Sequence, residues 1–67
     1  MSYKIISGPC TLLLEHESFD ILCDTDWSHK ISFAWAASKA IYDQKNDDVV
    51  SIEVDPYLFK LIIEQLI

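Results

Sequence analysis

The sequence contains no arginine, one glycine, two prolines and two cysteines among 67 residues. Without arginine, it lacks the side chain that makes bidentate contacts to phosphate groups and guanine bases. Its five lysines are scattered along the chain, and 11 acidic residues leave a formal net charge of -6. Because nucleic acids and anionic membrane surfaces attract clustered cations, we expect neither to be a direct ligand.

The low number of cysteines and glycines also limits chemistry. Cys10 and Cys23 are too few for a disulfide-rich secreted scaffold. With His16 and His29 they are candidate metal ligands, but no two of the four have the close spacing that normally nucleates a zinc site. One glycine offers little backbone freedom for an oxyanion site beside a nucleophilic cysteine. We therefore expect no metal, no cofactor and no catalysis; a minimal metal site or enzyme is the third interpretation.

Long hydrophobic runs are absent as well. The longest apolar-rich stretch, residues 57–67, is interrupted by Lys60, Glu64 and Gln65 and is too short to cross a bilayer. The N-terminus carries one lysine and no extended apolar segment, so we expect no signal peptide. Yet 51% of the residues are hydrophobic, which argues against disorder. We predict one small domain over residues 1–67, located inside the cell, in the cytoplasm or in a eukaryotic nucleus.

The pattern of apolar residues predicts an α+β fold. Residues 3–7 and 11–14 flank the turn dipeptide Gly8-Pro9, and in a strand over residues 19–23 Phe19, Ile21 and Cys23 would share one side. We interpret this first part of the chain as two or three short antiparallel strands. A helix is predicted next, within residues 29–44, with capping residues supplied by residues 24–28.

The second half predicts a strand and a C-terminal apolar helix. The strand spans residues 49–54, and Asp55-Pro56 is a strong signal for the start of the helix that follows. That helix, residues 57–67, is apolar around most of its circumference. A helix of this kind is unstable with one face in water on a small domain, so we expect it to be sandwiched or to dock on a partner.

Two segments resemble a known family. Residues 29–42, HKISFAWAASKAIY, resemble the first helices of BTB/POZ domains, with a His-Lys opening, apolar and small residues, a serine and an aromatic. Residues 50–66, VSIEVDPYLFKLIIEQL, resemble the strand and following helix of that family, where an acidic residue and proline precede a phenylalanine and an aliphatic helix. Elongin C, Skp-type adaptors and the tetramerisation domains of potassium channels carry variants of this pattern, and residues 3–7 are similar to the opening strand of elongin C.

The resemblance spans residues 3–67 and implies a protein-binding domain. The aromatic-Thr-Gly end of the family's helix and its later helices have no counterpart in the 67 residues. We therefore expect a truncated or minimal version of the BTB/POZ fold, acting as a non-enzymatic protein–protein interaction module. Self-association is expected too, since it would cover apolar helix surface that one small domain leaves open.

The candidate partner-binding residues are large apolar side chains and two loop carboxylates. Tryptophan is common at the energetic centre of interfaces, and a domain this short is not expected to enclose both of its tryptophans. The apolar helix supplies further contacts, and acidic loops attract basic partners over a distance. The predicted contact residues are Trp27, Trp35, Tyr57, Phe59, Ile62, Ile63, Leu66, Asp47 and Asp48.

The acidic composition supports an alternative from a different class. Small acidic proteins encoded by viruses and phages block host enzymes that handle nucleic acid, and some of them mimic its charge. The length, the charge of -6 and the lack of catalytic motifs fit such an inhibitor. The acidic residues are equally explained as a solvated surface that keeps a hydrophobic domain soluble.

Overall fold

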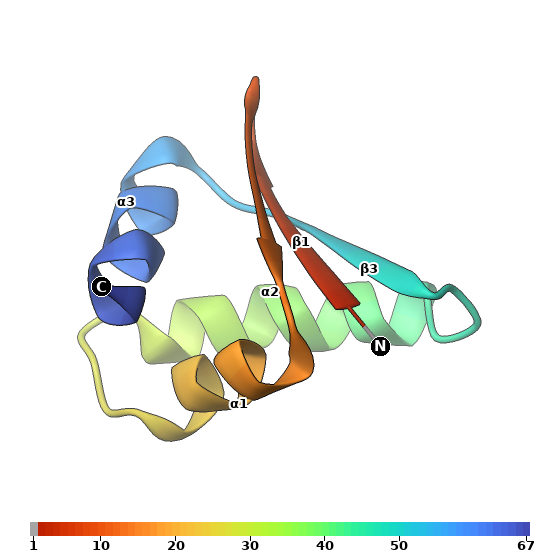
Figure 1. Ribbon diagram of the computed structural model, residues 1–67, viewed down its shortest axis with the longest axis horizontal. Coiled ribbons are helices and arrows are strands. Elements are labelled where there is room, and N and C mark those ends of the chain that lie inside the picture. The colour runs from red at the N-terminus through yellow and green to blue at the C-terminus, as the bar shows by residue number, and fades with distance from the viewer. Residues whose placement is uncertain (1) are drawn as a thin grey trace.

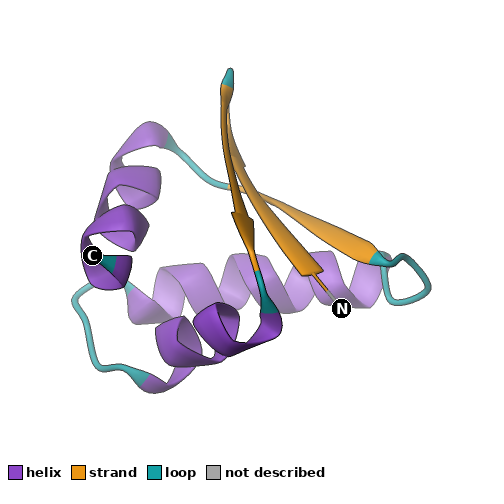
Figure 2. Ribbon diagram, viewed as in Figure 1, coloured by secondary structure: helices purple, strands orange, loops and turns teal. Residues whose placement is uncertain are grey.

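A computed structural model describes residues 2–67 as a three-stranded sheet with three helices (Figures 1 and 2). The sheet has the order β2-β1-β3, in which β1 pairs antiparallel with β2 and parallel with β3. The fold class is α+β, as predicted. The elements are β1 (Ser2–Ser7), β2 (Cys10–Leu14), α1 (His16–Asp24), α2 (Lys30–Asp43), β3 (Val49–Glu53) and α3 (Pro56–Leu66).

The predicted turn at Gly8-Pro9 closes the hairpin between β1 and β2. Ser7 is opposite Cys10, so the turn contains two residues. Gly8 has a φ of 58°, whereas the ring of Pro9 holds its φ negative, and this combination is that of a type II′ turn. Such a turn matches the twist of the flanking strands. The only glycine of the chain therefore occupies the position where a left-handed conformation is required.

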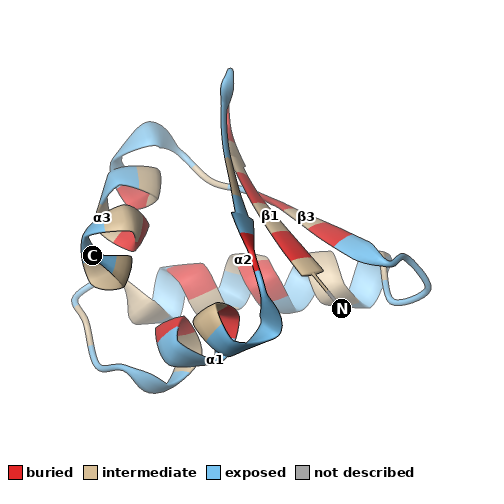
Figure 3. Cartoon of the chain, viewed as in Figure 1, coloured by how far each residue is buried: buried red, intermediate tan, exposed pale blue. Residues whose placement is uncertain are grey.

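One face of the sheet forms the floor of the core. Tyr3, Ile5 and Ser7 of β1 are buried, and so are Val50 and Ile52 of β3, while the residues between them are more exposed (Figure 3). This alternation follows from the pleat of the strands. The helices pack on this face: α2 against β3, α3 against β1, and α1 against both strands of the hairpin.

A chain of aromatic rings joins the sheet to the helices. The ring of Tyr3 on β1 stacks on Phe19 of α1 with centroids 3.8 Å apart. Phe19 in turn lies 5.8 Å from Phe33 of α2, and Phe33 lies 6.0 Å from Trp27 in the preceding loop. Phe33 is fully buried and sits in the middle of this chain. It connects α2 with both α1 and the loop between the two helices.

The strand predicted over residues 19–23 is wrong, because these residues belong to α1. Phe19 and Leu22 are the buried residues of this helix, three positions apart, whereas Ile21 is exposed. A strand would have buried Phe19 and Ile21 together. Short apolar runs fit both periods. Here the helix buries Phe19 against the ring of Tyr3 and leaves Glu17 and Asp24 exposed.

The predicted capping of α2 by residues 24–28 is also wrong. Asp24 is the last residue of α1, and Thr25 is its C-cap, whose N–H donates to the carbonyl oxygen of Ile21. The N-cap of α2 is His29, which makes no side-chain capping hydrogen bond. Residues that look like a helix start therefore end one helix and form the loop to the next.

The start of α3 agrees with its sequence signal. The Asp55 carboxylate accepts a hydrogen bond of 2.8 Å from the N–H of Leu58, and Pro56 occupies the first turn. A free N–H group of the helix is thereby satisfied, and proline loses no hydrogen bond at this position. Leu58 and Ile62 are buried in the core one turn apart.

Removing the central ring of the core is expected to unfold much of the protein. Phe33→Ala should cost about 3–5 kcal/mol, which is comparable to the whole stability of a domain this small. Tyr42→Ala on the same helix, whose side chain is 75% exposed, is the control and should change stability by less than about 0.5 kcal/mol. Urea titration followed by circular dichroism measures both, and equal midpoints would contradict the proposed core.

Loss of the α3 cap is expected to destabilise the fold by a smaller amount. Asp55→Ala removes the carboxylate that accepts from Leu58, at a cost of about 1 kcal/mol. Asp47→Ala, in an exposed loop, removes the same charge without a capping bond. Urea unfolding should therefore show a lower midpoint for Asp55→Ala only. An equal shift in both variants would assign the effect to net charge.

Candidate functional site

Helix α2 carries three large apolar side chains that are exposed on its outer side. Ile31, Trp35 and Tyr42 have 85%, 70% and 75% of their surface exposed. Separations of four and seven residues place them on one side of a helix. The opposite side carries the buried Phe33 and Ala37. Helix α2 is therefore apolar on two sides, one in the core and one in water, and we call Ile31, Trp35 and Tyr42 the α2 face.

Two lysines lie over the rings of the α2 face. The Nζ atom of Lys39 is 5.8 Å from the centroid of the Trp35 ring, and the Nζ atom of Lys45 is 5.8 Å from that of Tyr42. Each pair has the geometry of a cation–π contact. The face thus has an apolar middle with cationic groups beside it, in a protein whose net charge is strongly negative.

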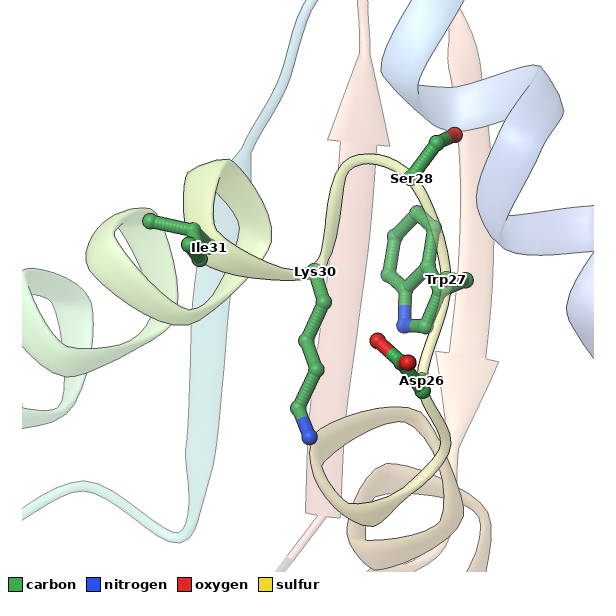
Figure 4. A pocket seen from close by; sticks show the side chains of 5 residues that line it. All are labelled: Asp26, Trp27, Ser28, Lys30 and Ile31. Carbon is green, nitrogen blue, oxygen red and sulfur yellow. The ribbon is translucent and has the colours of Figure 1, made fainter.

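Two hollows adjoin the α2 face. The first, of about 530 Å³, lies at the start of the helix and includes Ile31 (Figure 4). The second, of about 370 Å³, runs between α2 and the edge of β3 and includes Trp35. Asp26, Trp27, Ser28 and Lys30 complete the lining of the first. Ala36, Lys39, Ala40, Asp43, Gln44, Ser51 and Glu53 complete that of the second.

Trp27 is held in place by the fold. Its indole N–H donates a hydrogen bond of 2.9 Å to the carbonyl oxygen of Leu22, and its ring packs near Phe33. The Trp27 side chain is half-buried and borders the first hollow. Figure 4 shows the side chain of Ile31 pointing away from Trp27. Of the two predicted tryptophan contacts, Trp35 is the exposed one.

Most of the predicted contact residues of α3 are buried or half-buried within the domain. Ile62 is fully buried, so it has no surface to offer a partner. Phe59 and Leu66 are half-buried and pack against the core, and Ile63 is half-buried as well. Tyr57 alone is exposed, with its ring edge-on to His29 at a centroid distance of 5.3 Å.

Carboxylates collect on the outer side of α1 and in the loop before β3. Glu17, Asp20 and Asp24 are exposed at helical spacing, and the Nε2 atom of His16 lies 3.2 Å from the Asp20 carboxylate. The predicted contact residues Asp47 and Asp48 are exposed in the loop, far from these in sequence.

The two cysteines are free thiols in different surroundings. Cys10 is exposed next to the hairpin turn, whereas Cys23 is half-buried on α1. Burial raises the pKa of the Cys23 thiol, and the neighbouring carboxylates of Asp20 and Asp24 raise it further. Within residues 2–67, no group of three or more histidine, cysteine, aspartate or glutamate side chains has the arrangement of a metal site.

Sequence reasoning found Trp35 but missed Ile31 and Tyr42. The signal was present, because these three residues recur on one side of the same helix that places Phe33 and Ala37 on the other. The sequence instead favours α3 as the contact helix, because its composition is more uniformly apolar. The structure buries or half-buries most of the apolar side chains of α3 and leaves the α2 face in water.

Comparisons with known proteins identify no relative. No family model, no curated protein and no solved structure matches this chain. Among the helices of residues 2–67, none combines the length and the apolar character needed to cross a bilayer.

The difference between the two thiols predicts different rates of alkylation. In the folded protein Cys10 should react with iodoacetamide faster than Cys23, since Cys23 is half-buried and its raised pKa lowers the thiolate fraction at neutral pH. Cleavage after Glu15 and Glu17 places the two cysteines on different fragments, and mass spectrometry of these fragments measures both rates. The rates should converge in urea. A Cys23 that reacts as fast in the native as in the unfolded protein would contradict its position.

Proposed function

We propose that this chain is a non-enzymatic protein–protein interaction module and that the α2 face is its principal contact surface. The main support is that the side chains of Ile31, Trp35 and Tyr42 are all at least 70% exposed and lie on one side of one helix. Scattered exposed apolar residues are normal, but an aligned set with a central tryptophan has the composition of an interface core. Lysines beside the rings supply the polar rim that interfaces have.

The α2 face is a better contact surface than α3. The apolar side chains of α3 already pack against the sheet and α1, and only Tyr57 among its predicted contacts is exposed. Burying Trp35 against a partner costs no existing core contact. A rigid helix also holds its side chains in place before binding, which lowers the entropy lost on association.

We also propose that the chain is a relative of BTB/POZ domains. The resemblance of residues 50–66 to that family rests on a strand followed by an acidic residue, proline and an aliphatic helix. In the structure β3 is followed by Asp55 as N-cap and Pro56 at the start of α3, which supports the proposal. Members of this family act as protein-binding adaptors, in keeping with the proposed role. An intracellular location is proposed with it, where free thiols stay reduced.

The outer side of α1 favours a second candidate function. Glu17, Asp20 and Asp24 form a negatively charged line on a helix with no lysine. An acidic inhibitor that blocks a basic nucleic-acid-binding protein would use such a surface. Its binding would weaken steeply with salt, whereas contact through the apolar α2 face would change little.

A charge placed on the α2 face is expected to abolish partner binding without unfolding the protein. Trp35→Glu removes a side chain that is 70% exposed, so stability should change by less than about 0.5 kcal/mol. Asn46→Glu adds the same charge in an exposed loop and is the matched control. Tagged wild type and both variants are crosslinked in the cells that naturally produce the protein and are recovered through the tag. The bound proteins are quantified by mass spectrometry.

The expected result is a partner bound by wild type and Asn46→Glu and reduced at least about tenfold for Trp35→Glu. A partner retained by Trp35→Glu, and released by high salt, would contradict the α2 face and favour the acidic inhibitor. Circular dichroism of the purified variants shows whether each one folds.

A further inference from the structure

We infer that a second copy of this chain adds its β2 strand antiparallel to the free edge of β2, joining two three-stranded sheets into one. The pairing is centred on Leu12 and is carried by the backbone of Thr11 and Leu13. This pairing rests on the proposed function, because it treats the chain as an interaction module. It goes beyond that function, because it uses a surface separate from the α2 face.

The hairpin register determines which backbone groups of β2 point outward. Across a two-residue turn, the flanking residues Ser7 and Cys10 form a hydrogen-bonded pair. Pairs then alternate, so Leu12 is bonded to Ile5 of β1, whereas the N–H and C=O groups of Thr11 and Leu13 point away from β1. Strand β2 is an edge of the sheet, and within residues 2–67 no other strand pairs with it.

Contacts on the other side of β1 independently support this assignment. The N–H of Ser2 donates to the carbonyl oxygen of Asp48, and the carbonyl oxygen of Ile6 accepts from the N–H of Val54. The even-numbered residues of β1 therefore face β3. Its odd-numbered residues face β2, as the hairpin register requires.

The opposite edge of the sheet is closed by a side chain. At Ser51 of β3, the Gln44 amide donates to the backbone carbonyl oxygen at 2.8 Å and accepts from the N–H at 2.9 Å. The amide thus occupies the two positions that a further strand would use. Such protection of edges is a general device against unwanted pairing. At β2 no side chain does this for Thr11 or Leu13 among the hydrogen bonds of the described residues.

The β2 edge is complementary to itself. A two-fold axis at Leu12 sets Thr11 opposite Leu13 of the second copy. The outward-pointing N–H and C=O groups of Thr11 can then exchange hydrogen bonds with those of Leu13 in the second copy. The half-buried Leu12 side chain meets its own copy on the inner side of the sheet, and Leu13, which is 65% exposed, gains cover on the other. Residues 10–14 carry no charge, so the two strands approach without like charges opposite each other.

The turn end of β2 lies away from α1 and α2 (Figure 1). The hairpin projects beyond the helices, with its turn away from the body of the protein (Figure 1). The proposed contact is the two-fold, self-complementary kind that most homodimers use. A net charge of -6 on each copy opposes the approach, so added salt should strengthen the pairing.

Thr11→Pro tests the inference directly. Proline removes the outward N–H, which has no partner in the single chain, and is tolerated on edge strands. Thr11→Val keeps the backbone groups and is the matched control, and Trp35→Glu reports on the α2 face. Sedimentation equilibrium up to millimolar concentration, at low and high salt, gives each dimerisation constant, and NMR amide exchange of wild type reports on Thr11 and Leu13.

The expected result is a wild-type dimer that salt strengthens, with Thr11 and Leu13 amides protected as concentration rises. Thr11→Val and Trp35→Glu should dimerise as wild type does, and folded Thr11→Pro should dimerise at least about tenfold more weakly. A wild type that stays monomeric throughout overturns the inference, as does a dimer lost in Trp35→Glu but kept in Thr11→Pro. If Thr11→Pro does not fold, the amide exchange of wild type decides, and unprotected Thr11 and Leu13 in a dimer overturn the inference.

Discussion

The burial of Phe33 is the interaction on which the rest of the structure depends. Its ring lies between Phe19 of α1 and Trp27 of the connecting loop, and it leaves no surface in water. With Ala37 it sets the rotation of α2 about its own axis. When the side of α2 that carries Phe33 and Ala37 is buried, Trp35 on the opposite side faces the solvent. The same contact that stabilises the domain thus creates the surface proposed for partner binding.

The sheet shows a similar link between stability and interaction. The two-residue turn at Gly8 sets the register of the hairpin, and the register decides which groups of β2 remain unpaired. On the other edge, Gln44 follows directly after α2 and satisfies Ser51 of β3. One edge is closed from within the chain and the other is open. A small domain that buries only part of its apolar surface can gain stability by covering such places with a partner.

Much of the fold was predictable because its signals are local. The turn at Gly8, the Asp55 cap and the helical pattern around Phe33 each depend on neighbouring residues only. The helix at Phe19 was not predictable in this way, since a run of five residues fits either period and the choice is made by stacking on Tyr3, a distant residue. The candidate site was predicted in part: Trp35 was named, but whether α2 or α3 keeps its apolar side in water depends on which helix covers the sheet.

Trp35 is exposed in the unbound protein, whereas Trp27 is half-buried and hydrogen-bonded to the backbone of Leu22. Acrylamide quenching of tryptophan fluorescence measures this directly, in Trp27→Phe and Trp35→Phe variants that each retain one tryptophan and are shown to be folded by circular dichroism. We expect strong quenching of Trp35 in the unbound protein, weaker quenching of Trp27, and loss of Trp35 quenching when the partner binds. Equal quenching of the two rings, or a Trp35 shielded in the unbound monomer, would contradict this expectation.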